Sequence, residues 1–549
     1  MRRTLTLSAA LVSAAALAAS AQRTTDPIEH IREADLRRDL FALAGDDTRG
    51  REGGTLDELT ASAWLAERAR EAGLQPAGDN GTYFQFFPLE RFRVSASSEV
   101  AIGGRTLRLG RDVVTDAIVL AHVDAPVVQA DAAAIADLLA APPPPGAAGT
   151  TGSYEDQALV VTYARPAPPA AAPGTPPGQG RGGAGRGGQA NALRTWARGV
   201  HRAATARDAA ATIVLVPDTE QEQWERVAFP FPRGSYALDP DGTAEPRTAR
   251  RAAPLLYVRA SAIGDALAPP DQNPARPTTV SADQNPVRPM SGRVVASIFT
   301  DRFTYPSVNV VGRVPGRDPA LAAEHVLFSA HQDHDGERYT VNGDNIWNGA
   351  DDNATTTVAL LAIARAMSSS PGRRSALFVW HGAEERGLMG SRWFVKHPTV
   401  PLASIVAVLN GDMMGRNDPG TAALLGALPP HRNSPELVEM AHAANVAVSQ
   451  FVVDSSWDDP DHREGWYYRS DHLPYARAGI PALFFTTLLH PDYHTPFDNP
   501  DRIDVAKLTR MTRWMYATGR AVAEADRAPA LDPAFKLERC RDFTGNYCG

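Results

Sequence analysis

Cysteine is almost absent from this sequence: Cys540 and Cys548 are the only two among 549 residues, and both lie within the last ten. A disulfide-framed scaffold is therefore excluded, because such folds spread several bridges through a short chain. In an oxidising compartment the two thiols are expected to form one disulfide that closes a short C-terminal loop. A shared metal ion is the alternative for the pair.

Long apolar runs are also absent after the first 21 residues, so we expect no membrane-spanning helix in the rest of the chain. The N-terminus has the pattern of a secretory signal peptide. Arg2 and Arg3 precede an apolar run from Leu5 to Leu17, and Ala19-Ser20-Ala21 supplies the small residues of a cleavage site. The sequence therefore predicts a signal peptide over residues 1–21 and a soluble, exported protein, either periplasmic or secreted.

An excess of positive charge is the third feature that the sequence lacks. Lysine and arginine number 55 against 63 aspartates and glutamates, which gives a formal net charge of −8. This balance excludes the basic footprint of a nucleic-acid-binding protein. The apolar fraction of 43% is ordinary for a globular protein, and 549 residues are too many for one compact core, so we expect at least two domains.

Composition divides the chain further. Residues 22–88 predict two helices, over Ile28–Leu43 and Leu56–Ala72, and form the N-terminal part of a domain that resumes at residue 291. Residues 89–290 form an insert, in which the stretches Pro142–Pro145 and Pro166–Gly188 predict loops. Strands are predicted within the insert at Ala158–Tyr163, Ala211–Val216 and Leu255–Val258.

Residues 291–530 alternate apolar strands with helices and are followed by a tail, residues 531–549. This alternation predicts an α/β fold with a mostly parallel central sheet flanked by helices. The expected strands are Val326–Ala330, Ala376–Trp380, Ile405–Leu409 and Ala482–Thr486. The expected helices are Ala354–Met367, Met389–Lys396, Pro435–Ala444 and Val505–Ala523.

Acidic residues and histidines follow these strands, in the segments His331-Gln332-Asp333-His334, Gly349-Ala350-Asp351-Asp352-Asn353, Ala383-Glu384-Glu385, Asn410-Gly411-Asp412 and Tyr493-His494. Ligand sites in open α/β sheets lie at the carboxyl ends of the strands, so these segments are expected to converge. Three carboxylates and two imidazoles are the ligand set of a two-zinc site with one bridging carboxylate. Asp351 alone could instead be a helix cap. No G-x-S-x-G or H-E-x-x-H motif is present.

The sequence here resembles the two-zinc aminopeptidases of the bacterial leucyl aminopeptidase and aminopeptidase Y type. The resemblance lies in Asn345–Asn353 (NIWNGADDN), Ala383–Ser391 (AEERGLMGS), Asn410–Arg416 (NGDMMGR), Ser470–Pro481 (SDHLPYARAGIP), His490–Asp504 (HPDYHTPFDNPDRID), and more weakly in Arg49–Thr55 and Gly73–Phe87. It implies a zinc-dependent aminopeptidase that binds two Zn²⁺ per chain and acts on peptides through a metal-bridging water.

The resemblance also implies a role for individual residues. Asp352 would bridge the ions, Glu385 and His494 would complete one, and His331 and Asp412 the other. Glu384 matches the general base, and Asp333 would orient the His331 imidazole. Ser470 and Asp471 match a motif that lines the site.

The insert resembles a protease-associated domain through Ala209–Val216 (AAATIVLV) and Ala252–Leu267 (AAPLLYVRASAIGDAL). Such a domain would act as a wall beside the site, and the alternative is a spacer without effect on catalysis. Three other functions remain open on the same fold: a single-zinc acyltransferase like glutaminyl cyclase, a metallocarboxypeptidase, and a non-catalytic binding protein.

Overall fold

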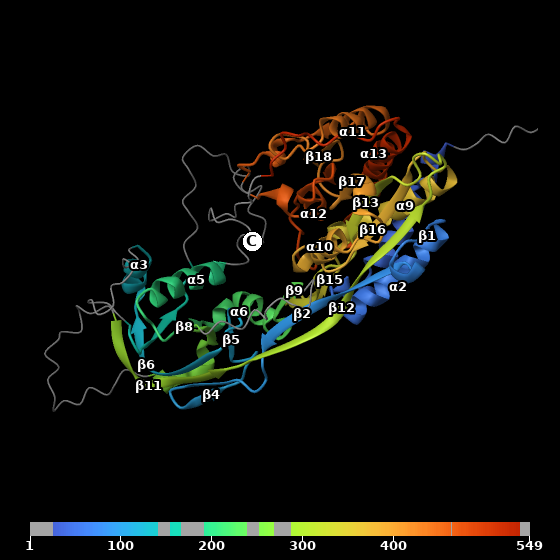
Figure 1. Cartoon of the computed structure of the whole chain (residues 1–549). Helices are drawn as coiled ribbons and strands as arrows, with labels where there is room; N and C mark the ends of the chain where they lie inside the picture. Colours follow the sequence, from blue (N-terminus) through green and yellow to red (C-terminus); the bar gives the residue numbers. More distant parts are fainter. Residues whose placement is uncertain are drawn as a thin grey trace, which may run out of the picture.

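The computed structural model in Figure 1 describes residues 26–140, 154–165, 192–238, 252–267, 287–462 and 464–537. The predicted signal peptide, both predicted Pro/Gly-rich loops and the two cysteines lie outside these ranges. Among the described residues, no helix combines the length and the apolar character needed to cross a membrane.

A ten-stranded sheet forms the centre of the larger lobe, and its strand order is β19-β18-β20-β17-β13-β16-β12-β2-β9, with β1 paired to β12. The four central strands are parallel and almost entirely buried, as expected for apolar strands covered on both faces. They are β20 (Ala482–Thr486), β17 (Ile405–Gly411), β13 (His325–His331) and β16 (Ser375–His381). The other strands are β1 (Gln75–Pro76), β2 (Phe84–Val94), β9 (Ser235–Leu238), β12 (Thr300–Val314), β18 (Thr421–Leu425) and β19 (Val452–Val453).

Helices cover both faces of this sheet. Alternate residues of β13 point to opposite faces: Phe328 belongs to one apolar core and Leu327 to another. The first core is covered by α1 (Glu33–Leu43), α2 (Leu56–Glu71), α9 (Thr356–Ser369), α11 (Pro435–Val448) and α13 (Val505–Glu524). The second is covered by α10 (Met389–Lys396) and α12 (His472–Arg477).

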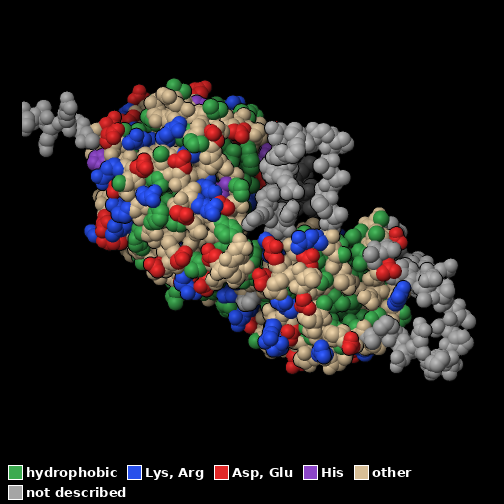
Figure 2. Space-filling model, turned by 180° about the vertical axis from the view of Figure 1, so that it is seen from behind, with side chains coloured by type: hydrophobic (Ala, Val, Ile, Leu, Met, Phe, Trp, Pro, Cys, Tyr) green, Lys and Arg blue, Asp and Glu red, His purple; other side chains and the backbone are tan. Residues whose placement is uncertain are grey.

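The smaller lobe contains an eight-stranded sheet, with the order β4-β3-β11-β6-β7-β8-β10-β5, and lies beside the larger lobe (Figures 1 and 2). Its strands are β3 (Glu99–Ile102), β4 (Arg105–Leu107), β5 (Val113–Thr115), β6 (Ala121–Ala130), β7 (Ala158–Thr162), β8 (Ala211–Val216), β10 (Leu255–Arg259) and β11 (Val287–Ile298). Its helices are α3 (Ala132–Ala140), α5 (Ala192–Thr205), α6 (Gln221–Ala228), α7 (Pro230–Arg233) and α8 (Ala260–Ile263). The predicted α/β fold interrupted by a smaller β-rich unit is therefore confirmed.

Two long strands join the lobes. β2 and β12 pair antiparallel from Val94 opposite Thr300 to Phe84 opposite Val310, and they run from the smaller lobe into the large sheet (Figure 1). β9 comes from the predicted insert but pairs with β2, so it extends the large sheet. Through this pairing, β9 and the preceding helix α7 lie at the larger lobe.

Buried histidines make the stability of the fold depend on pH. His472 is fully buried against Phe484, and burial lowers the pKa of its imidazole to about 3. Below about pH 6.5 the unfolded chain takes up a proton at this residue and the folded chain does not, so stability falls as the pH falls towards 3. When the pH falls from 7 to 5, the free energy of unfolding of His472→Phe should decrease by about 2 kcal/mol less than that of the unaltered chain. Urea unfolding at the two pH values measures this difference. Equal losses would contradict this.

Candidate metal centre

The carboxyl ends of the central strands carry the candidate ligands. His331 is the last residue of β13, Asp412 follows β17, and Glu384 and Glu385 form a short turn after β16. Asp352 lies in a π-helical turn, Ala350–Thr355, before α9. His494 follows β20, and all of these segments meet at one edge of the sheet, as parallel strands require.

One group of side chains surrounds His331. Its Nε2 lies 3.2 Å from Asp352 Oδ1, 3.5 Å from Asp412 Oδ2 and 3.9 Å from Glu384 Oε2. His331, Glu384 and Asp412 each present an atom able to bind a metal, and these atoms lie within 4.8 Å of one another.

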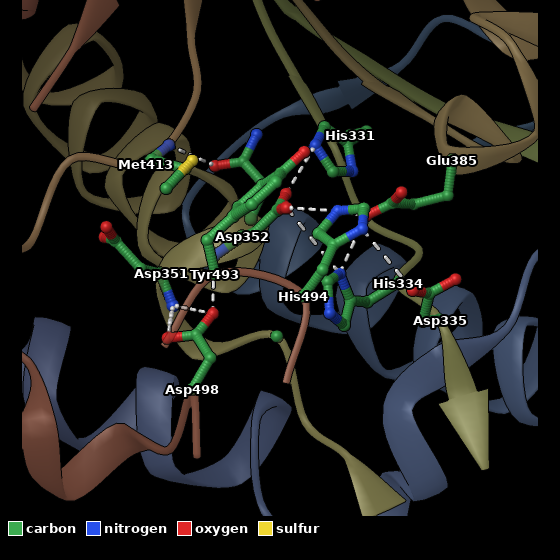
Figure 3. Close-up of polar contacts among 12 residues, drawn as sticks. His331, His334, Asp335, Asp351, Asp352, Glu385, Met413, Tyr493, His494 and Asp498 are labelled. Atoms are coloured by element: carbon green, nitrogen blue, oxygen red, sulfur yellow. Dashed lines mark hydrogen bonds and ion pairs between the residues drawn. The ribbon is translucent and has the colours of Figure 1, made fainter. Parts of the chain in front are cut away.

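A second group contains His334, Asp352, Glu385 and His494, whose potential ligand atoms also lie within 4.8 Å of one another (Figure 3). His494 Nε2 is 3.0 Å from Asp352 Oδ2 and 3.2 Å from Glu385 Oε1. His334 Nδ1 is 2.8 Å from the same Glu385 oxygen. One carboxylate, that of Asp352, therefore lies between the two groups, with one oxygen towards each.

Asp351 faces away from both groups. Its Oδ1 accepts a hydrogen bond from the Gly415 amide at 2.7 Å, and its Oδ2 lies 3.4 Å from His490 Nε2. Asp498 accepts hydrogen bonds from the backbone amides of Asp351 and Asp352 at 3.0 and 3.1 Å, which fixes the turn that carries them (Figure 3). Of the two adjacent aspartates, only Asp352 reaches the candidate ligands.

The electrostatics of the site call for a cation. The buried Asp412 Oδ1 has no hydrogen-bond partner among the described residues. Burial, reinforced by neighbouring carboxylates, raises the pKa of Glu384 well above its ordinary range and also raises that of Asp412. Buried charges without partners are costly, and a divalent cation would relieve this cost. Imidazole nitrogens and carboxylate oxygens are ligands that suit Zn²⁺.

Asp333 contacts both the predicted base and the imidazole beside it. Its carboxylate accepts hydrogen bonds from the backbone amides of Glu384 at 2.9 Å and Glu385 at 3.3 Å. The His331 Nδ1 lies 3.1 Å from the Asp333 backbone carbonyl and 3.9 Å from its carboxylate. The nearer partner of the imidazole is therefore the carbonyl, and the carboxylate fixes the turn that carries the two glutamates.

The predicted lining residues also lie at the centre. Ser470 Oγ donates to Asp412 Oδ2 at 2.9 Å and accepts from Asn410 Nδ2 at 2.8 Å. Asp471 is fully buried, and burial raises its pKa to about 7. Ser470 thus orients a candidate ligand, and Asp471 adds acidic character near Glu384.

Two residues of the centre were not predicted from the sequence. His334 lies in the same four-residue segment as His331, but a single histidine three residues on gave no reason to choose it. Asp335 Oδ2 lies 3.6 Å from His494 Nδ1, and Asp335 also pairs with Arg386 at 3.2 Å. The backbone carbonyl of Asp335 accepts a hydrogen bond from Arg233 of α7 at 2.7 Å, so the smaller lobe contacts the residue next to a candidate ligand.

A hollow of about 620 Å³ lies between the lobes, close to this contact. Trp224 and Phe229, in and after α6, line it on one side, and Arg338 and Tyr339 of β14 (Gly336–Val341) line it on the other. β14 pairs with β15 (Asp344–Trp347) in a small separate hairpin.

Comparisons with known proteins agree with this arrangement. Residues 309–519 match the model of Peptidase family M28. A probable leucine aminopeptidase of Arthroderma benhamiae is 26% identical over 37% of this chain and 54% of its own length. Aminopeptidase YwaD of Bacillus subtilis is 27% identical over 33% of this chain and 39% of its own length. The chain thus spans about half the length, or less, of these curated relatives.

Two solved structures share the fold along nearly the whole chain. The zinc aminopeptidase BSAP of Bacillus subtilis superposes with a TM-score of 0.52 at 16% identity, over 92% of this chain and 98% of its own. The aminopeptidase of Aneurinibacillus sp. strain AM-1 superposes with a TM-score of 0.50 at 15% identity, over 93% of this chain and 98% of its own. These two structures show the fold, and the family match over residues 309–519 with the curated relatives confirms the family resemblance predicted from the motifs.

Proposed function

We propose that this chain, in which residues 309–519 belong to Peptidase family M28, is an exported zinc-dependent aminopeptidase that removes N-terminal residues from peptides. The observation that carries the proposal is the pair of ligand groups that share Asp352, with Glu384 beside them. Export rests on the signal-peptide pattern of residues 1–21.

The proposed centre holds two Zn²⁺. His331 and Asp412 would hold one ion, Glu385 and His494 would hold the other, and Asp352, whose two oxygens face His331 and His494, would serve both. When bound, the ions acidify the attacking water and polarise the scissile carbonyl, so that no protein nucleophile is needed. Histidine and carboxylate ligands fit this assignment.

Glu384 is the proposed general base. It takes the proton of the attacking water and passes it to the leaving amine. Its position within 3.9 Å of His331 Nε2 supports this role, and Asp333 holds its backbone in place. Burial and the neighbouring Asp471 and Glu385 carboxylates raise the pKa of Glu384 well above its ordinary range.

Specificity for N-termini would come from the acidic surroundings of the centre. A free α-ammonium group carries a positive charge, and buried carboxylates near the ions, such as Asp471, attract it. A peptide with a blocked N-terminus offers no such charge.

The smaller lobe is proposed to act as a wall that limits access to short or unstructured peptides. Arg233 of α7 is ion-paired to Glu52 of the catalytic lobe at 2.8 Å and binds the Asp335 carbonyl next to the centre. The hollow between α6 and β14 would receive residues that follow the scissile bond.

The test compares leucyl p-nitroanilide with its N-acetylated form and with a C-terminally amidated peptide. We expect the zinc-loaded enzyme to hydrolyse the free leucyl compound and to shorten the amidated peptide from its N-terminus, with no cleavage of the acetylated compound. Release of C-terminal residues from blocked peptides, or cyclisation of N-terminal glutamine without hydrolysis, would contradict the proposal.

A further inference from the structure

We propose that His334 is a direct ligand of the ion held by Asp352, Glu385 and His494. This half of the centre then has four protein ligands, whereas the half with His331, Asp412 and the shared Asp352 has three. The inference deepens the proposed function and rests on it, because it concerns the same metal centre.

The position of the imidazole is the first argument. His334 Nδ1 lies 2.8 Å from Glu385 Oε1 and 4.0 Å from Asp352 Oδ2. Its ring stands nearly perpendicular to that of His494, with 86° between the planes and 5.3 Å between the ring centres (Figure 3). Two imidazoles and two carboxylates thus offer ligand atoms that lie within 4.8 Å of one another, and these are donor types that suit Zn²⁺.

The isolation of the ring is the second argument. His334 is completely buried; its Nε2 has no hydrogen-bond partner among the described residues, and its Nδ1 faces the Glu385 carboxylate at 2.8 Å. Leaving a buried polar atom unpaired destabilises the folded chain. A metal ion bound by one of the nitrogens removes this cost.

The fixed backbone around His334 is the third argument. Its amide donates to the Arg51 carbonyl at 3.3 Å, and the fully buried Arg51 guanidinium donates to the carbonyls of Gln332, Asn348 and Gly349. A Cβ at Gly349 would lie 2.3 Å from His334 Cγ, so only glycine leaves room for the ring. The chain therefore holds this imidazole in the centre from both sides.

The main rival role is that of a positioning residue, in which His334 only donates a hydrogen bond to Glu385. An asparagine in place of His334 distinguishes the two roles, because it could take over the positioning role but not the ligand role. An asparagine amide can still donate to Glu385 but is a poor zinc ligand. Loss of a group that only orients a ligand costs ~10–100-fold in metal affinity, and loss of a ligand itself costs more.

The first experiment measures zinc affinity and stoichiometry of the full chain by calorimetry and elemental analysis. We expect His334→Asn and His334→Ala both to bind one of the two ions more than ~100-fold more weakly and to keep the other. His431→Asn is the matched control, since His431 is also buried but pairs with Asp458 outside the ligand groups, and it should keep both ions. Near-normal affinity for both ions in His334→Asn would overturn the proposal.

A second measurement needs no variant and so does not depend on folding of a mutant. X-ray absorption of the unaltered chain loaded with a single zinc counts the imidazoles around that ion. Because four ligands bind more tightly than three, the first ion is expected in the half with His334 and His494, which predicts two imidazoles. One imidazole around the first ion would overturn the proposal.

These outcomes are separable from failure of the proposed function. A chain that binds two zinc ions with His334 as a ligand but hydrolyses no aminoacyl substrate would refute the activity alone. A chain that hydrolyses leucyl p-nitroanilide while His334→Asn keeps both ions would refute the ligand alone.

Discussion

Glu384→Gln is expected to lower kcat by ~10²–10⁴-fold while both zinc ions stay bound. Glutamine keeps the volume of the side chain and removes its ability to take a proton. Because neither ion depends on Glu384 in the proposed assignment, the metal content should be unchanged. Steady-state hydrolysis of leucyl p-nitroanilide, with elemental analysis of the same preparation, measures both quantities.

A control separates loss of the base from loss of an acidic side chain in general. Glu436 is partly exposed, pairs with Arg527 and belongs to neither ligand group, so Glu436→Gln should keep full activity. Near-normal turnover in Glu384→Gln would show that another group takes the proton. Loss of zinc in that variant would indicate that Glu384 binds an ion itself. Glu384 belongs to the same group of potential ligands as His331 and Asp412.

The second large effect is expected from Asp352→Asn. Asp352 contacts His331 through one oxygen at 3.2 Å and His494 through the other at 3.0 Å, so the amide would weaken both halves of the centre together. We expect affinity for both ions to fall by more than ~100-fold, and activity to fall to that of the metal-free enzyme at limiting zinc. Competition with a zinc chelator measures the affinities.

Asp351→Asn is the matched control for this variant. Burial and the neighbouring Asp498 raise the pKa of Asp351 well above its ordinary range, so an amide is a close substitute for the neutral acid. Its contact with the Gly415 amide needs only an acceptor, which asparagine keeps. Both ions should therefore remain bound. Equal losses in the two variants would contradict the assignment of Asp352 as the shared ligand.

Much of the catalytic lobe could be predicted from local sequence patterns. β20 and α10 begin and end at the predicted residues, because strongly periodic or fully apolar segments define them. α9 begins two residues later than predicted, since Ala350–Thr355 forms the π-helical turn that carries Asp352. The segments that carry the candidate ligands were found because they follow the strands, and parallel strands bring their ends to one edge. The choice of ligands within these segments came from the family resemblance.

Other features had no local signal. β9 is four residues long and joins the large sheet only through its pairing with β2, a contact between distant parts of the chain. Asp335 joins the centre through its carboxylate, 3.6 Å from His494 Nδ1, and its carbonyl accepts a hydrogen bond from Arg233, which lies 102 residues earlier. His334 lies three residues after a predicted ligand, but its burial and its unpaired Nε2 become visible only when the loops of Arg51 and Gly349 are placed around it.

The central claim is a two-zinc aminopeptidase, and a zinc titration of the metal-depleted enzyme tests it most directly. Hydrolysis of leucyl p-nitroanilide is followed as zinc is added in fractions of one equivalent. The ligand groups around Asp352 predict that activity reaches its maximum at two zinc ions per chain. Full activity at one zinc per chain, or no activity at any zinc content, would contradict the account.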